Sequence, residues 1–424
     1  MNLNFITMIE FNNSYRYDLN LKFDQVKRII FGQNMSGEAA NELKRINSKN
    51  VMIVTDPNVN RFGLLKKVID SLSGASIKYE IYDDLSNEPK MDNIINAVNF
   101  ARNCKDFDAV IGLGGGSVLD TSKMVASMIT NEGEPAEYLT PVEDKFKNPA
   151  VPKILMPTTG GTGSEVSNMS VVIDKESMYK TWAASSNLLA DTAIVDPVLN
   201  MSAPPRTTAA SGMDALAHNI EGLISSEANA ISDGLATKAA TLISQNLRTA
   251  YNDPGNLDAR SSMSMGAMLG GMVITFPWVA GPSILGHCLG EAFGPKYGAI
   301  HGVAVGLSLP YILDFNISAA YSKIASLASI FGIKHHGESP RTVASKIPEA
   351  IITLLEDLDM PTTLSQINFP KGDIEKFATY IYESRQKLYD LPKFNPRRLT
   401  IDNSIRLISN MYDGVFENYD NGHR

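Results

Sequence analysis

Four residues of this 424-residue chain could together hold a metal ion. Asp214 and His218 lie four residues apart in SGMDALAHNIEGL, a stretch with helical spacing, so they would project from one helical face about one turn apart. His287 and His301 follow further along the chain. Three imidazoles and a carboxylate suit a borderline divalent cation such as Fe²⁺ or Zn²⁺. Because three of the six histidines in the chain fall in this arrangement, the sequence predicts a metal site.

Two glycine-rich loops precede these four residues. In LGGGSVLD, residues 113–120, three glycines follow a predicted strand, where the backbone can approach a ligand and the next helix offers its N-terminus to a phosphate. A tight turn explains this loop equally well, because the pattern differs from the common G-x-G-x-x-G fingerprint. PTTGGTGSEVSN, residues 157–168, adds hydroxyl groups and open backbone amides after another predicted strand. A nucleotide site together with a metal site suggests redox chemistry on a small alcohol or carbonyl compound.

The predicted secondary structure that positions these residues changes from mixed strand and helix to helix alone near residue 197. Before it, short β-rich apolar runs alternate with amphipathic stretches, which predicts a parallel sheet of the α/β class. After it, the apolar spacing is helical. We therefore predict an α/β dinucleotide-binding domain at 1–197 and an all-helical metal-binding domain at 198–424. The strands are expected at 51–56, at 77–84, and in the stretches DAVIGLGGGS, PKILMPTT and TAIVDP.

Composition narrows the class of protein. The net charge of −8 argues against a nucleic-acid partner. Two cysteines, Cys104 and Cys288, are too few for a disulfide framework and favour a reducing compartment. We find neither a signal-peptide pattern at the N-terminus nor an apolar stretch of about 18 residues that would span a bilayer. The chain is therefore expected to be cytoplasmic, with no membrane partner.

Four motifs in order resemble the group III, iron-containing alcohol dehydrogenases. They are VIGLGGGSVLDTSK, PTTGGTGSEV, GMDALAHNIEG and the later pair of histidines. The resemblance covers nearly the whole chain and implies a dinucleotide-binding α/β domain, a helical domain, and a cleft where the metal and the nicotinamide meet. It implies an enzyme that transfers hydride between NAD(H) or NADP(H) and an alcohol or aldehyde, and an assembly that is a homodimer or larger.

The resemblance also assigns roles to residues. It places the metal, expected to be Fe²⁺ with Zn²⁺ as the alternative, on Asp214, His218, His287 and His301. It places Asp56 at the adenosine ribose, where an acid favours NAD over NADP, although Asp56 is also suited to capping a turn or a helix. The complete set of implied cofactor-binding residues is Asp56, Gly114, Gly115, Gly116, Ser117, Asp120, Thr158, Thr159, Thr162 and Lys180.

The chain departs from the family pattern beside the metal site. Many relatives have a second histidine one turn after the first cleft histidine, where this chain has Glu291. A carboxylate there could relay a proton, bind the substrate, join the metal shell or support a ligand histidine, and we favour a place outside the metal shell. Trp278, Ala280 and Pro282 also differ from residues that line the family's substrate pocket. Cys288 would point about 100° away from its ligand neighbour and is expected to pack in the core.

Two other classes of protein remain open at this stage. One is an enzyme of the same architecture that acts on a phosphorylated polyol or resembles dehydroquinate synthase. Such an enzyme needs several basic residues at its site, and near the motifs we find only Lys180, Arg206 and Lys296. The other is a binding protein without catalytic activity, against which the intact set of metal ligands argues.

Overall fold

A computed structural model describes the chain at residues 23–85, 90–104, 106–139, 143–174, 179–277, 279–281, 284–383 and 393–418. Within these residues, six strands form one parallel sheet in the order β1-β8-β5-β4-β2-β3. The predicted fold class is confirmed, and each of the five strands expected from the sequence is present. The strands are β1 (Ile29–Phe31), β2 (Asn50–Val54), β3 (Lys78–Tyr82), β4 (Ala109–Gly114), β5 (Lys153–Pro157) and β8 (Thr192–Val195).

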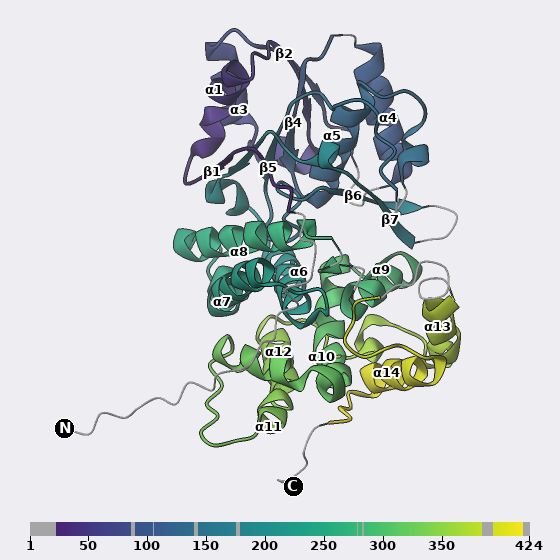
Figure 1. The fold of residues 1–424 in the computed structure, drawn as a ribbon. Coiled ribbons are helices and arrows are strands. Elements are labelled where there is room, and N and C mark those ends of the chain that lie inside the picture. Colours follow the sequence, from purple (N-terminus) through teal and green to yellow (C-terminus); the bar gives the residue numbers. More distant parts are fainter. Residues whose placement is uncertain are drawn as a thin grey trace, which may run out of the picture.

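Helices cover both faces of this sheet (Figure 1). Successive residues of β2 point to opposite faces, so Met52 packs with α4 and α5 while Val51 packs with α1 and α3. The central strand β4 is buried along its whole length, as expected for a parallel sheet covered on both sides. These helices are α1 (Ala39–Arg45), α2 (Pro57–Arg61), α3 (Lys66–Gly74), α4 (Met91–Asn103) and α5 (Gly116–Met128).

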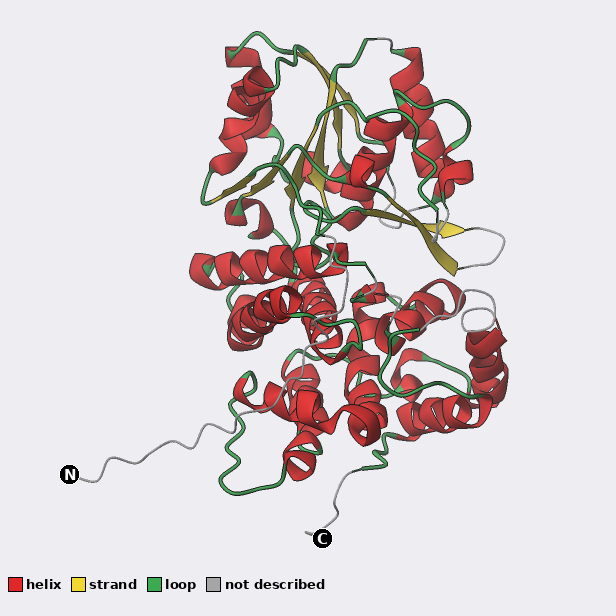
Figure 2. Cartoon of the chain, viewed as in Figure 1, coloured by secondary structure: helices red, strands yellow, loops and turns green. Residues whose placement is uncertain are grey.

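An antiparallel hairpin lies outside the main sheet and was not predicted from the sequence. It consists of β6 (Met169–Asp174) and β7 (Tyr179–Ala184), and Ile173 pairs with Lys180 across it. Figure 2 shows the hairpin extending from the sheet toward the helical half of the chain, and β7 packs there against α9 (Leu285–Tyr297). The hairpin therefore brings residues of β7, in the first half of the chain, close to α9 in the helical half.

From Pro205 to the last described residues, the regular elements are all helices. The long helix α6 (Pro205–Ile224) lies at the centre and packs against α7, α8 and α10. The last sheet strand ends at Val195, and the boundary of the two domains at residue 197 stays a prediction. The other helices are α7 (Ala230–Asn252), α8 (Leu257–Thr275), α10 (His301–Ser326), α11 (Pro340–Ala344), α12 (Ile347–Asp357), α13 (Ile374–Ile381) and α14 (Ile401–Asp413).

One helical segment, His301–Ser329, is long and apolar enough to cross a membrane by length and composition. The expectation that no stretch of the chain reaches this limit is therefore wrong. The apolar side chains of this segment pack in the interior of the protein, because 78% of its most apolar window is buried. A buried core helix meets the same criterion of length and composition as a membrane span.

Candidate metal and dinucleotide site

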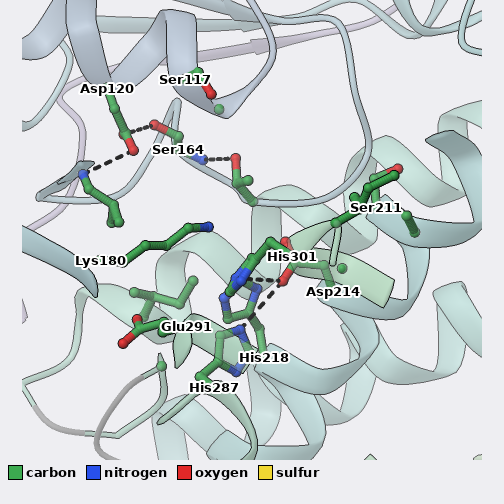
Figure 3. A pocket seen from close by; sticks show the side chains of 18 of the residues that line it. Ser117, Asp120, Ser164, Lys180, Ser211, Asp214, His218, His287, Glu291 and His301 are labelled. Atoms are coloured by element: carbon green, nitrogen blue, oxygen red, sulfur yellow. Dashed lines mark hydrogen bonds and ion pairs between the residues drawn. The ribbon is translucent and has the colours of Figure 1, made fainter. Parts of the chain in front are cut away.

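A cavity of about 330 Å³ lies where the hairpin and α5 meet the helices α6, α9 and α10 (Figure 3). Its volume is in the range of small-molecule sites. Side chains from both halves of the chain line it, which is the arrangement expected for a site between two domains. Those that the sequence singled out are Gly116, Ser117, Asp120, Thr162, Lys180, Arg206, Asp214, His218, His287, Glu291 and His301.

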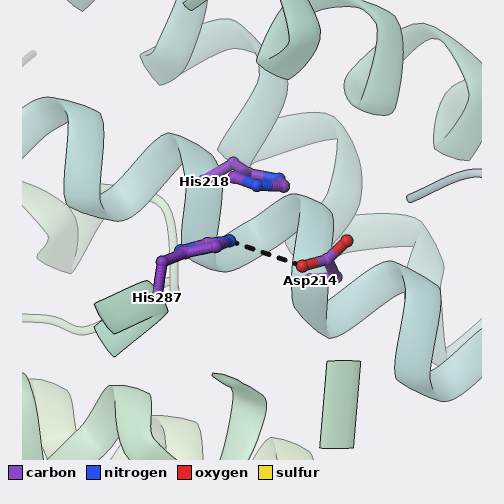
Figure 4. A group of neighbouring side chains, drawn as sticks. All are labelled: Asp214, His218 and His287. Atoms are coloured by element: carbon purple, nitrogen blue, oxygen red, sulfur yellow. Dashed lines mark ion pairs between the residues drawn. The ribbon is translucent and has the colours of Figure 1, made fainter. Parts of the chain in front are cut away.

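The four predicted metal ligands converge on one side of this cavity. Asp214 and His218 project from α6, while His287 comes from α9 and His301 begins α10. The Nε2 atoms of His287 and His301 lie 3.4 Å and 3.5 Å from Asp214 Oδ1. Figure 4 shows the rings of His218 and His287 stacked beside the carboxylate, with centroids 4.0 Å apart.

The spacing of these atoms fits a metal ion. Donor atoms about 2.1 Å from a tetrahedral ion stand about 3.4 Å from one another. The ligand atoms of Asp214, His218 and His287 all lie within 4.8 Å of one another. Among the described residues, the buried Asp214 Oδ1 and His287 Nε2 have no hydrogen-bond partner. Buried polar atoms are nearly always paired, so these two point to a ligand between them.

The protonation states of Asp214, His218 and His301 also suit metal binding. Burial alone would raise the pKa of Asp214, but the surrounding imidazoles lower it below its usual value. Burial lowers the pKa of His218 to about 3, and it lowers the pKa of His301 well below the usual value with help from Lys180. A carboxylate that is ionised and imidazoles that are neutral are the forms that bind a cation.

A fifth residue, Glu221, holds His287 in place and was missed in the sequence. Its carboxylate is fully buried and accepts hydrogen bonds from the ring Nδ1 of His287 and, at 3.0 Å, from the backbone N–H of the same residue. Burial lowers the pKa of His287, but the Glu221 and Asp214 carboxylates outweigh it and raise the pKa to about 10. The pocket around this ring therefore favours positive charge, which a proton or a metal ion can supply.

Helical spacing could have identified Glu221 as a candidate. It follows Asp214 by seven residues and His218 by three, so all three lie on one face of α6. Gly286 makes the contact possible, because an added Cβ at that position would overlap Glu221 Oε1. This pairing of residues on two helices is not visible in the sequence alone.

The two glycine-rich loops pack against each other beside the cavity. The helix α5 begins at Gly116, just after β4, and its N-cap residue is Gly115, which has no side chain to cap the first turn. An added Cβ at Gly116 would lie 2.7 Å from Thr162 Cγ2, so only glycine allows this approach of the second loop. Thr158 N–H also donates to the carbonyl of Gly114 at 3.0 Å. The N-terminal end of a helix, beside hydroxyl groups, fits the phosphates of a dinucleotide.

Other predicted cofactor residues lie along the same end of the sheet but outside the cavity lining. Gly114, Gly115, Thr158 and Thr159 form the strand ends and loop starts behind the cavity. Asp56 follows β2 and caps α2, because its Oδ1 accepts from Asn58 N–H at 2.8 Å and from Val59 N–H at 3.1 Å. The capping role considered from the sequence is therefore present, and a ribose contact stays a prediction.

Glu291 lies in α9 one turn after His287 and lines the cavity at 4% exposure. Of the other departures from the family pattern, Ala280 is buried in the helical core, while Trp278 and Pro282 lie outside the described residues. Cys288 is fully buried in an apolar cluster, as its predicted packing role requires.

Comparison with known proteins identifies the family. Residues 26–197 match the family model described as iron-containing alcohol dehydrogenase, and residues 208–412 match the C-terminal domain of the same family. The chain belongs to the iron-containing alcohol dehydrogenase family. This confirms the resemblance and the predicted class of enzyme, an oxidoreductase acting between an alcohol and a carbonyl compound with a nicotinamide dinucleotide.

Several relatives cover almost the whole chain. Long-chain-alcohol dehydrogenase 1 of Geobacillus thermodenitrificans (strain NG80-2) is 34% identical over 87% of this chain and 93% of its own length. The crystal structure of a 1,3-propanediol oxidoreductase is 28% identical, with a TM-score of 0.86, and covers 92% of this chain and 100% of that one. The sulfoacetaldehyde reductase of Bifidobacterium kashiwanohense, solved with NAD⁺, is 26% identical, with a TM-score of 0.81 over 93% and 99%.

Proposed function

We propose that this enzyme is an iron-dependent, NAD-linked dehydrogenase of small neutral alcohols and their aldehydes. One observation supports this most strongly. The cluster of Asp214 and three histidines opens into the same cavity as the start of α5 and Lys180. A metal ion held by this cluster and a dinucleotide held at the start of α5 would therefore both reach a substrate in this cavity. A cytoplasmic location and a homodimer, both expected from the sequence, stay predictions.

The protein's part in the reaction is to bind, orient and exclude water. When bound, the cation supplies Lewis acidity and the dinucleotide exchanges hydride with the substrate carbon. Asp214, His218, His287 and His301 would hold the cation, and the first turn of α5 would hold the pyrophosphate. The walls between them keep the reacting carbon away from water, which strengthens the electrostatic interactions inside.

The lining of the cavity indicates the class of substrate. Met169, Val171, Ile274 and Ile300 give it apolar walls, and the Glu291 carboxylate lies in the same lining. A carboxylate in a narrow, largely apolar cavity disfavours an anionic substrate. Two cationic residues also line the cavity: the resemblance places Lys180 at the cofactor, and Arg206 is exposed at the start of α6. We therefore propose neutral substrates rather than the sulfoacetaldehyde named for two of the relatives.

A substrate screen tests this function. The metal content is measured first, and the enzyme reconstituted with Fe²⁺ or Zn²⁺ is then assayed for NAD⁺ reduction with primary alcohols and 1,3-propanediol, and for NADH oxidation with aldehydes and sulfoacetaldehyde. Turnover with neutral alcohols and the Fe²⁺ form is expected. A preference for sulfoacetaldehyde would refute the proposed substrate class, and lack of NAD(P)-linked turnover with every compound would refute the proposed activity.

Replacement of Asp56 by glycine is expected to improve the use of NADP⁺ relative to NAD⁺ by about tenfold. Removing one negative charge at a partly exposed site relieves roughly 1.4 kcal/mol of repulsion toward a 2′-phosphate. The ratio of kcat/KM for the two cofactors measures this effect. Asp56→Asn is the matched control, because asparagine keeps the helix cap and removes only the charge. An unchanged ratio in both variants would show that Asp56 does not face the ribose.

Replacement of Glu291 by glutamine is expected to lower turnover by about tenfold and to change the pH–rate profile, with metal content unchanged. The reason is its position in the cavity, one turn from His287 and outside the set of four ligands. A parallel fall in metal content would instead identify Glu291 as a ligand. Wild-type kinetics together with wild-type metal content would leave Glu291 without a functional role.

A further inference from the structure

Two buried charged side chains of α5, Asp120 and Lys123, bind the segment between residues 164 and 171. Asp120 Oδ1 accepts hydrogen bonds from Ser164 Oγ at 2.6 Å and from Lys123 Nζ at 3.2 Å. Its Oδ2 accepts from the backbone N–H of Val171 at 3.1 Å, and its backbone carbonyl accepts from Ser170 Oγ at 3.0 Å. The carboxylate is therefore occupied by groups of the protein itself.

Lys123 completes this network. Its side chain is fully buried, and Nζ donates to Asp120, to Ser167 Oγ at 3.1 Å and to the carbonyl of Met169 at 2.7 Å. Three acceptors satisfy the three N–H groups of an ammonium. Burial lowers the pKa of Lys123, while the neighbouring Asp120 and Glu165 carboxylates oppose this shift. A buried ion pair adds little net stability compared with apolar residues, but a fully bonded one fixes a unique arrangement.

The segment held in this way joins two parts of the cofactor site. It contains the end of the 157–168 loop, whose Thr162 packs on Gly116, and the start of the β6–β7 hairpin. The hairpin register then places Lys180 opposite Ile173. Figure 3 shows Lys180 between the Asp120 region and the metal-binding histidines. The position of Lys180 relative to the phosphate-binding end of α5 thus depends on Asp120 and Lys123.

We propose that Asp120 and Lys123 are positioning residues for the dinucleotide. They set the 157–168 loop and Lys180 relative to the first turn of α5, and they act through Ser164, Ser167 and the hairpin rather than by contact with the cofactor. This role rests on the proposed binding of a dinucleotide in the cavity. It differs from the direct contact that the sequence resemblance implies for Asp120.

The test is NADH binding to Asp120→Asn, followed by protein fluorescence. Asparagine keeps the size of the side chain, but its NH₂ group faces donors on Ser164, Lys123 or Val171. We expect the dissociation constant for NADH to rise roughly tenfold to hundredfold, since small misplacements of binding groups have effects of this size. Metal content is expected to stay at the wild-type level. Asp70→Asn is the matched control, because it breaks the exposed Lys66–Asp70 pair on α3 of the same domain.

A double variant separates positioning from stability. Asp120→Asn combined with Lys123→Met removes both charges, and replacing a buried ion pair in this way is often neutral for stability. We expect this protein to fold with a wild-type melting temperature and to retain the weakened NADH binding. Wild-type NADH affinity in either variant would overturn the proposal, and so would failure of both to fold, which would show a role in folding instead. Lack of NADH binding by the wild-type protein would refute the proposed function itself.

Discussion

His287→Ala should remove bound metal and lower turnover by about three orders of magnitude. The ring Nε2 is 3.4 Å from Asp214 Oδ1, and it belongs to the group of three ligand atoms, from Asp214, His218 and His287, that all lie within 4.8 Å of one another. A catalytic cation supplies several kcal/mol of stabilisation to the transition state, and each 1.36 kcal/mol corresponds to about tenfold in rate. Metal content after gel filtration and NAD⁺ reduction with an alcohol substrate measure the two effects.

The stability of this variant is expected to fall without loss of the fold. Among the described residues, alanine leaves the buried Glu221 carboxylate with only the backbone N–H of residue 287 as its partner, and breaking a buried pair costs about 3–5 kcal/mol. Far-UV circular dichroism should remain that of the wild type. Cys288→Ala is the matched control, because Cys288 is equally buried next to His287 but packs in an apolar cluster. Full metal occupancy in His287→Ala would show that the ligand assignment is wrong.

The sequence predicted those parts of the fold whose signals are local. Buried apolar runs followed by glycine or hydroxyl residues marked β4 and β5, and amphipathic spacing marked the helices around the sheet. The strand β1 was not predicted, because three residues are too few to show a strand pattern in the sequence. It is a strand because it pairs with β8, which lies far away along the chain. The β6–β7 hairpin was missed for a related reason, since it packs against α5 and α9 rather than continuing the alternation of strand and helix.

The residues of the candidate site also divide into those that the sequence could identify and those that depend on long-range packing. Asp214 and His218 could be paired from helical spacing. His287 and His301 were added because of their imidazole side chains, and the resemblance to the family then assigned the same four ligands. Glu221 could not be assigned, because its function depends on the packing of α6 against α9 and on Gly286, which leaves room for its carboxylate. Asp120 was predicted to belong to the cofactor site. Its contacts with Ser164 and Val171 could not be predicted, because they arise from packing between segments far apart in the sequence.

The second large effect is expected for Glu221→Gln, which should weaken metal binding by about 100-fold. The residues that orient metal-bound histidines typically contribute 10–100-fold to metal affinity. Glu221 offers an acceptor oxygen to each of two donors on His287, the backbone N–H and the ring Nδ1. Glutamine has one acceptor oxygen and one NH₂ group, so it can satisfy only one of these donors.

The ring can relieve this conflict only by moving or by carrying its hydrogen on Nε2. Either response takes the Nε2 lone pair away from Asp214 and from the cation that both residues would bind. Chelator competition measures the metal dissociation constant directly, and the spectrum of the Co²⁺-substituted protein reports the coordination geometry.

Gly286→Ala should produce a similar loss of metal affinity, because its Cβ would displace the Glu221 carboxylate from the side of α9. Glu227→Gln removes an acid just beyond the end of α6, where the side chain is partly exposed, and should leave metal affinity unchanged. If Glu221→Gln bound metal as tightly as the wild type, His287 would be oriented by its own helix, and the buried carboxylate would serve only the packing of α6 against α9.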